Sequence, residues 1–93
     1  NLSFLDLGQN QLTGTIPVEF ENNIGMRSLS LDNNLLTGTI PPQLGNLSNL
    51  FWLNLGNNQL SGTLPIELAQ PVSLYYLLLN NNQLTGTIPS AYG

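Results

Sequence analysis

Two carboxylates, Asp6 and Asp32, are the residues of this 93-residue chain best suited to acid–base chemistry. If they lie on neighbouring parallel strands, their backbones are about 8 Å apart, which is loosely compatible with the acid and base of an inverting glycosidase. The chain has no histidine and no cysteine, so it lacks the commonest general base and any thiol nucleophile. An open sheet face would also leave both carboxylates hydrated. We therefore interpret them as surface groups and expect no enzymatic activity.

Charge and composition narrow the classes of partner. The chain has one basic residue, Arg27, against five acidic residues, for a net charge of −4. Nucleic acids and anionic membrane surfaces are bound through clustered Lys and Arg, so neither is an expected partner. The absence of cysteine and histidine disfavours a metal site, and no cofactor is expected. The longest apolar stretch, Leu74–Leu79, is far shorter than the roughly 20 residues of a membrane span, so we expect no membrane insertion.

Aromatic side chains recur at a fixed step and form the first candidate binding site. Trp52 and Tyr76 are 24 residues apart and are expected on adjacent strands, whereas the direction of Phe51 and Tyr75 stays open. Neighbouring exposed aromatics are typical of binding hot spots, and the alternative is that they only stabilise the sheet. Arg27 is suited to a carboxylate on a peptide or an acidic sugar, and the alternative is a solvated side chain. The expected ligand-binding residues are Phe4, Asp6, Arg27, Trp52, Asn54 and Tyr76.

Threonine and serine on either side of recurring glycines form a second candidate site. They are Thr13 and Thr15, Thr37 and Thr39, Ser61 and Thr63, and Thr85 and Thr87. Stacked coils would place their hydroxyls in two parallel columns, similar to the Thr-x-Thr arrays of ice-binding solenoids. The alternative is that threonine stands there because it suits an extended backbone.

These candidate sites depend on a repeat that runs through the chain. A step of 24 residues with no insertion relates leucines, glycines and prolines, and also relates Asn10, Asn34, Asn58 and Asn82. Such a period predicts a solenoid of stacked coils. In one unit Leu53 and Leu55 alternate with Trp52 and Asn54, which predicts a short strand with leucines inside and the other side chains outside. The asparagines are expected inside the coil, where their amides bond to backbone groups.

The remainder of each coil carries two further signals. Leu60, Gly62 and Leu64 alternate with polar residues, which predicts a second extended segment. Gly62 stands there either because a Cβ would not fit or because φ is positive, and the sequence leaves both readings open. Pro65 suits the first position of a short helical turn.

The repeat resembles the leucine-rich repeat family, in particular its plant-type subclass with the motif LxxLxLxxNxLxGxIP. The second unit carries this motif as Met26, Leu29, Leu31, Asn34, Leu36, Gly38, Ile40 and Pro41. The resemblance implies an α/β solenoid: a right-handed coil with a concave parallel sheet, a second short β segment and a convex side of 3-10 or irregular structure. It covers residues 1–93 as one segment of about four coils, at residues 2–25, 26–49, 50–73 and 74–93.

Members of this family include plant receptor-like kinases, receptor-like proteins and polygalacturonase-inhibiting proteins. The resemblance therefore implies a non-enzymatic recognition module, extracellular or at the cell surface, that binds a protein, peptide or glycan on its concave sheet. Ice binding and binding of a cell-wall enzyme are the alternatives. Cysteine-bearing caps are absent, so we expect a fragment of a longer ectodomain whose bare ends allow end-to-end association. Asn1 and Asn46 begin glycosylation sequons.

Overall fold

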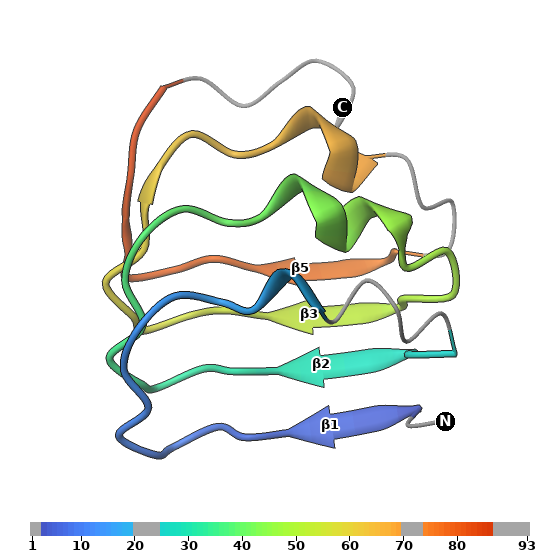
Figure 1. The fold of residues 1–93 in the computed structure, drawn as a ribbon, viewed down its shortest axis with the longest axis horizontal. Helices are drawn as coiled ribbons and strands as arrows, with labels where there is room; N and C mark the ends of the chain where they lie inside the picture. The colour runs from blue at the N-terminus through green and yellow to red at the C-terminus, as the bar shows by residue number, and fades with distance from the viewer. Residues whose placement is uncertain (1–2, 20–24, 70–73, 87–93) are drawn as a thin grey trace.

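Four parallel strands, one from each coil, form the main sheet of the computed structural model, which describes residues 3–19, 25–69 and 74–86. In order across the sheet they are β1 (Phe4–Asp6), β2 (Ser28–Ser30), β3 (Trp52–Asn54) and β5 (Tyr76–Leu78) (Figure 1). Strand pairing follows the sequence repeat, so that Trp52 lies opposite Ser28 on one side and Tyr76 on the other. The predicted solenoid with a parallel sheet is therefore confirmed. The right-handedness expected of the coil stays a prediction.

A second, shorter sheet lies on another side of the coil. It contains β4 (Ser61–Gly62) and β6 (Gln83–Leu84), which confirms the predicted second extended segment in the third and fourth coils. Its register is shifted relative to the repeat, because Ser61 lies opposite Gln83 and not opposite the equivalent Thr85. The first two coils have no assigned strands at this level but are joined by hydrogen bonds, including one of 2.9 Å from the N–H of Thr37 to the carbonyl of Gly14.

Short 3-10 turns complete the coils. They are η2 (Pro42–Asn46) and η3 (Ile66–Ala69), which lie side by side (Figure 1). Pro42 suits the first position of η2, because the N–H that proline lacks would have no partner within the turn at that position. The prediction that Pro65 itself opens the turn is wrong by one residue, because η3 begins at Ile66.

The core is a column of leucines between the sheet and the 3-10 turns. Leu53 and Leu55 are fully buried, as predicted, and burial of such side chains is the main term stabilising the stack. The prediction of an inward, buried leucine is wrong for Leu7 and Leu12, which are exposed. The physical reason is that within the described residues only one coil packs against the first coil, whereas two coils cover each leucine of the middle coils.

Asparagine side chains bond adjacent coils to each other. The Nδ2 of Asn58 donates to the carbonyl of Leu31 in the preceding coil at 3.0 Å and to that of Leu55 in its own coil at 3.2 Å. Asn34 and Asn82 make the equivalent bonds, and both Asn34 and Asn58 are buried. The prediction fails for Asn10, which is exposed and donates only within its own coil, because no described coil lies on its open side.

Both explanations of Gly62 hold at once. Its φ is +81°, in the left-handed region that favours glycine, and a Cβ there would stand 2.8 Å from Cγ2 of Thr39. The sequence did not indicate a second set of residues with positive φ, one in each coil, which directly precede Asn10, Asn34, Asn58 and Asn82. Its members are Gln9, Asn33, Asn57 and Asn81, with φ between 56° and 58°.

Candidate functional site

Four aromatic rings gather on the outward face of the main sheet, and we call Phe51, Trp52, Tyr75 and Tyr76 the aromatic cluster. The ring centroids of Trp52 and Tyr76 are 5.3 Å apart, and Phe51 lies 5.4 Å from both Tyr75 and Tyr76 with its ring steeply inclined to theirs. The exposed fractions are 74% for Tyr75, 49% for Tyr76 and 40% for Phe51. The rings therefore support one another and still present a large apolar surface to a partner.

Backbone bonds between coils continue at Phe51 and Tyr75, although both residues precede their strands. The N–H of Tyr75 donates to the carbonyl of Phe51 at 3.0 Å, and the N–H of Phe51 donates to the carbonyl of Arg27 at 2.7 Å. These bonds extend the pairing between coils by one residue beyond the strands. The exposure and ring contacts of both side chains decide the direction that the sequence left open, and both add to the outward surface.

Trp52 is held in place by a residue that the sequence did not indicate. Its Nε1 donates to the hydroxyl oxygen of Ser30 at 3.0 Å, so the indole extends over the neighbouring strand β2. This bond accounts for the partial burial of Trp52 in an otherwise exposed cluster. The only signal in the sequence was Ser30 itself, a small hydroxyl residue on the adjacent strand. It stands at the outward position after the one that pairs with Trp52.

Phe4 and Arg27 lie outside this cluster. Phe4 is 71% exposed and pairs in register with Ser28, so the serines of β2 separate it from Trp52. Arg27 is exposed, and its guanidinium forms no ion pair with any residue that the structure describes. Its backbone carbonyl accepts the N–H groups of Phe51 and Trp52, which fixes its main chain at the edge of the cluster.

The two candidate carboxylates converge above a glycine. Oδ1 of Asp6 accepts the N–H of Gly8 at 2.9 Å, and Oδ2 of Asp32 accepts the Asn33 amide at 2.8 Å. A Cβ on Gly8 would stand 2.6 Å from Oδ1 of Asp32 and 3.2 Å from Oδ1 of Asp6. Asp6 is exposed and Asp32 partly exposed, so both carboxylates face water in an open setting.

The same arrangement recurs two coils later with amides in place of carboxylates. A Cβ on Gly56 would stand 2.7 Å from Oδ1 of Asn80 and 3.3 Å from Oδ1 of Asn54. Gly56 is buried, because these amides cover it. Asn54 also accepts the N–H of Gly56 at 3.1 Å, so its side chain is already engaged by its own strand.

Other features of the described residues bear on the expected classes of site. Across residues 3–19, 25–69 and 74–86, no group of three or more acidic, histidine or cysteine side chains could hold a metal ion. Among these residues the structure also contains no helix long and apolar enough to cross a bilayer. Asn46 is exposed at the end of η2, whereas Asn1 lies outside the described residues.

The two threonine columns differ in their hydrogen bonding. In one column the hydroxyls of Thr37 and Thr85 donate to backbone carbonyls of the preceding coil, over long distances of 3.4 Å, whereas those of Thr13 and Ser61 bond to no described residue. In the other column, which we call the free threonine column, no hydroxyl bonds to a described residue, and its members are Thr15, Thr39 and Thr63. Their methyl groups lie against the glycines of the next coil, 2.8–3.0 Å from where a Cβ would stand. Thr87 lies outside the described residues.

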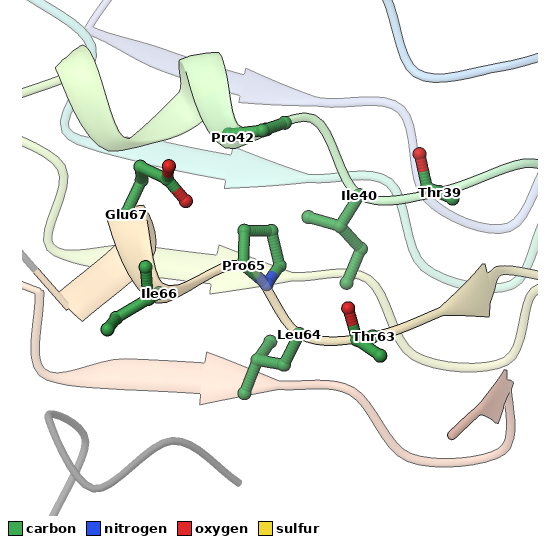
Figure 2. A pocket seen from close by; sticks show the side chains of 8 residues that line it. All are labelled: Thr39, Ile40, Pro42, Thr63, Leu64, Pro65, Ile66 and Glu67. Atoms are coloured by element: carbon green, nitrogen blue, oxygen red, sulfur yellow. The ribbon is translucent and has the colours of Figure 1, made fainter. Parts of the chain in front are cut away.

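Two depressions that the sequence did not indicate run beside the free threonine column. The larger, of about 510 Å³, lies between the second and third coils and contains Thr39, Thr63, Pro65 and Glu67 in its lining (Figure 2). The smaller, of about 280 Å³, lies one coil earlier and is lined in part by Thr15, Thr39, Pro42 and Gln43. Together we call them the lateral groove.

Comparisons with known proteins agree with this geometry. Models of the leucine-rich repeat match residues 24–84 and residues 1–23, and a search of curated proteins gave no significant match. Among solved structures, the complex of PEPR1 with AtPEP1 is 44% identical with a TM-score of 0.96, covering 98% of this chain and 13% of that one. The Arabidopsis receptor kinase HAESA, in complex with the peptide hormone IDA and the co-receptor SERK1, is 46% identical with a TM-score of 0.90, covering 98% of this chain and 15% of that one.

A plant ice-binding protein is also similar, at 34% identity and a TM-score of 0.94, covering 98% of this chain and 30% of that one. This chain therefore spans less than a third of the length of each of these three structures. The family models together account for residues 1–84, and the strand register repeats with the same period as the motif. The chain belongs to the leucine-rich repeat family, with repeats of the plant type.

Proposed function

We propose that this chain is a recognition segment that binds a protein or peptide on the outward face of its main sheet, the face that the family resemblance expects to be concave. The observation that carries the proposal is the aromatic cluster, because Tyr75, Tyr76 and Phe51 are 40–74% exposed on adjacent coils and play no part in the core. Similar structures include receptor ectodomains in complex with peptide hormones, which supports this class of ligand.

The physical argument for the site is that its apolar surface is already ordered. Aromatic side chains dominate binding hot spots, because burying them from water contributes about 25 cal/mol per Å². Trp52 is fixed by its bond to Ser30, so little side-chain entropy remains to be lost when a partner binds. In this proposal Phe4 makes a separate apolar contact with the partner, and Asp6, Arg27 and Asn54 make polar contacts with it. Part of this proposal is that the segment belongs to an extracellular protein, as do the similar receptor ectodomains.

Selection of binders from a displayed library of random peptides on the folded chain tests this proposal. The expected result is that the selected peptides lose affinity by roughly tenfold or more for Trp52→Ala combined with Tyr76→Ala, with circular dichroism unchanged. Ile66→Ala is the matched control, because Ile66 is also exposed and apolar but lies on a 3-10 turn away from the sheet. Peptides that bind the double variant as tightly as the parent chain would show that the sheet face is not the site.

Ice binding is the second candidate function, favoured by the similarity to a plant ice-binding protein and by the free threonine column. Its hydroxyls and methyl groups repeat once per coil in an exposed row. Inhibition of ice recrystallisation that disappears when Thr39 and Thr63 are both replaced by leucine supports this function. A chain that inhibits recrystallisation at no concentration excludes it. Binding of a cell-wall enzyme, as by polygalacturonase-inhibiting proteins, stays a prediction within the first proposal.

A further inference from the structure

The lateral groove is a repeating feature rather than an isolated depression. Thr39 and Pro42 line both of its parts, so the two depressions adjoin. Equivalent residues line both parts: Thr15 and Thr39 line the smaller part, and Thr39 and Thr63 line the larger part. The volume of the larger part, about 510 Å³, is within the range of about 300–1,000 Å³ found for small-molecule sites. A ligand that extends along the stack could therefore make the same contacts in successive coils.

The two sides of the groove differ in chemistry. On one side stand Thr39 and Thr63, whose hydroxyls point in the same direction from successive coils (Figure 2). On the other side Glu67 provides a carboxylate, and Gln43 provides an amide at the equivalent position one coil earlier. Between them the lining is apolar, with Leu64 and Pro65 partly exposed and Ile40 buried beneath. The groove thus offers an apolar strip with hydrogen-bonding groups along both sides.

The groove does not suit a peptide that would bind by adding a strand to a sheet. A peptide that extends a sheet needs free backbone N–H and carbonyl groups. Here the nearby strand β4 already has a coil on each side: the N–H of Ser61 donates to the carbonyl of Gly38 at 2.8 Å, and the N–H of Thr85 donates to that of Gly62 at 2.8 Å, so this strand has no free edge. What the groove offers instead are side-chain hydroxyl, amide and carboxylate groups. A ligand that matches them carries many hydroxyls of its own around apolar C–H surfaces, as a chain of sugar rings does.

Charge decides which kind of sugar fits. Among the described residues that line the groove, Glu67 is the only charged one, and no lysine or arginine lines either part. An acidic sugar would therefore meet a like charge with no compensating cation. We propose that the lateral groove binds a neutral oligosaccharide, with its rings against the apolar strip and its hydroxyls bonded to Thr39, Thr63 and Glu67. This site is separate from the sheet face and does not depend on the function proposed for it.

Titration of the chain with neutral oligosaccharides, followed by NMR of its threonine methyl groups, tests this inference. The probes are cellohexaose, mannohexaose and a xyloglucan heptasaccharide, with hexagalacturonate as the acidic comparison. The expected result is that at least one neutral probe shifts the methyl signals of Thr39 and Thr63 and leaves that of Thr85 unchanged. Hexagalacturonate should bind at least tenfold more weakly. Absence of any shift at millimolar neutral sugar, or equal binding of the acidic probe, would overturn the inference.

Isosteric variants then test the assigned contacts. Thr39→Val combined with Thr63→Val keeps the shape of the groove and removes two hydroxyls, so the dissociation constant should rise roughly tenfold or more. Thr37→Val is the matched control, because the Thr37 hydroxyl already donates to the carbonyl of Gly14, and it should leave sugar binding unchanged. Trp52→Ala should also leave it unchanged, which separates this site from the sheet face. Unaltered sugar binding by the double valine variant would contradict the proposed contacts even if the methyl signals shift.

Discussion

The side-chain oxygen of Asn58 accepts the backbone N–H of Leu36, one coil away, at 3.1 Å. The same amide donates to the carbonyl of Leu31 in that coil, so one buried side chain satisfies two backbone groups of its neighbour. We expect Asn58→Ala to lower the free energy of unfolding by roughly 1–3 kcal/mol, because the N–H of Leu36 would be left buried without an acceptor. Urea denaturation measures this difference.

Asn10→Ala is the control for that prediction. Asn10 occupies the equivalent position but is exposed and donates only to carbonyls of its own coil. Its replacement should change the free energy of unfolding by no more than about 0.5 kcal/mol, as for most surface substitutions. Equal losses for the two variants would show that bonding between coils is not what the asparagine contributes.

Gly62→Ala should destabilise the chain by at least 1–2 kcal/mol, roughly the energy of placing a Cβ in the left-handed region. The φ of Gly62 is +81°, and the new Cβ would also press on Cγ2 of Thr39. Thr39→Ser removes that methyl group, so it should recover the steric part of the loss and none of the backbone part. A double-mutant cycle measured by thermal unfolding separates the two. Gly25→Ala, where a Cβ would meet nothing within 4 Å, should be nearly neutral.

Gln9→Asn should stabilise the chain, by roughly 0.5 kcal/mol. Gln9 has a φ of 56°, and asparagine tolerates this conformation better than glutamine, as its presence at Asn33, Asn57 and Asn81 illustrates. Gln11→Asn makes the same chemical change at a residue without positive φ and should not stabilise. The midpoint of thermal unfolding is the measurement. A midpoint that rises for neither variant, or equally for both, would contradict the explanation from backbone strain.

Ser30→Ala should release the indole of Trp52 from its bond to the Ser30 hydroxyl. Trp52 is the single tryptophan of the chain, so its fluorescence reports on this site alone. We expect lower steady-state anisotropy and emission at longer wavelength, with a loss of about 0.5–1.5 kcal/mol in the free energy of unfolding. Ser28→Ala, on the same strand, is the control. Identical spectra for the Ser30 variant and the parent chain would show that packing alone orients the ring.

The sequence predicted the main sheet well because its period has no insertions. With every coil of the same length, equivalent residues must lie beside each other, and Leu53 does pair with Leu29 and Leu77. The alternation of Leu53 and Leu55 with Trp52 then decides which side chains face outward, since successive side chains of a strand point to opposite faces. Burial at the first coil was less predictable, because exposure of Leu7 depends on what packs against that coil and not on its motif.

The candidate sites were only partly predictable. The pairing of Trp52 with Tyr76 follows from the repeat, but the Trp52–Ser30 bond joins residues at non-equivalent positions and cannot be read from the period. The shifted register of the second sheet also has no signal in the sequence. In the second coil the Thr37 hydroxyl reaches a backbone carbonyl while that of Thr39 bonds to no described residue, although both residues flank the same glycine.

By itself, the sequence determined the period, the leucine core, the parallel sheet and the set of outward residues, because each follows from spacing along one coil. Only the tertiary structure decided which of those residues act together. The assembly of the aromatic cluster, the covering of Gly56, the free threonine column and the lateral groove all depend on contacts between different coils. Packing and hydrogen bonds between coils set those contacts, and no single repeat encodes them.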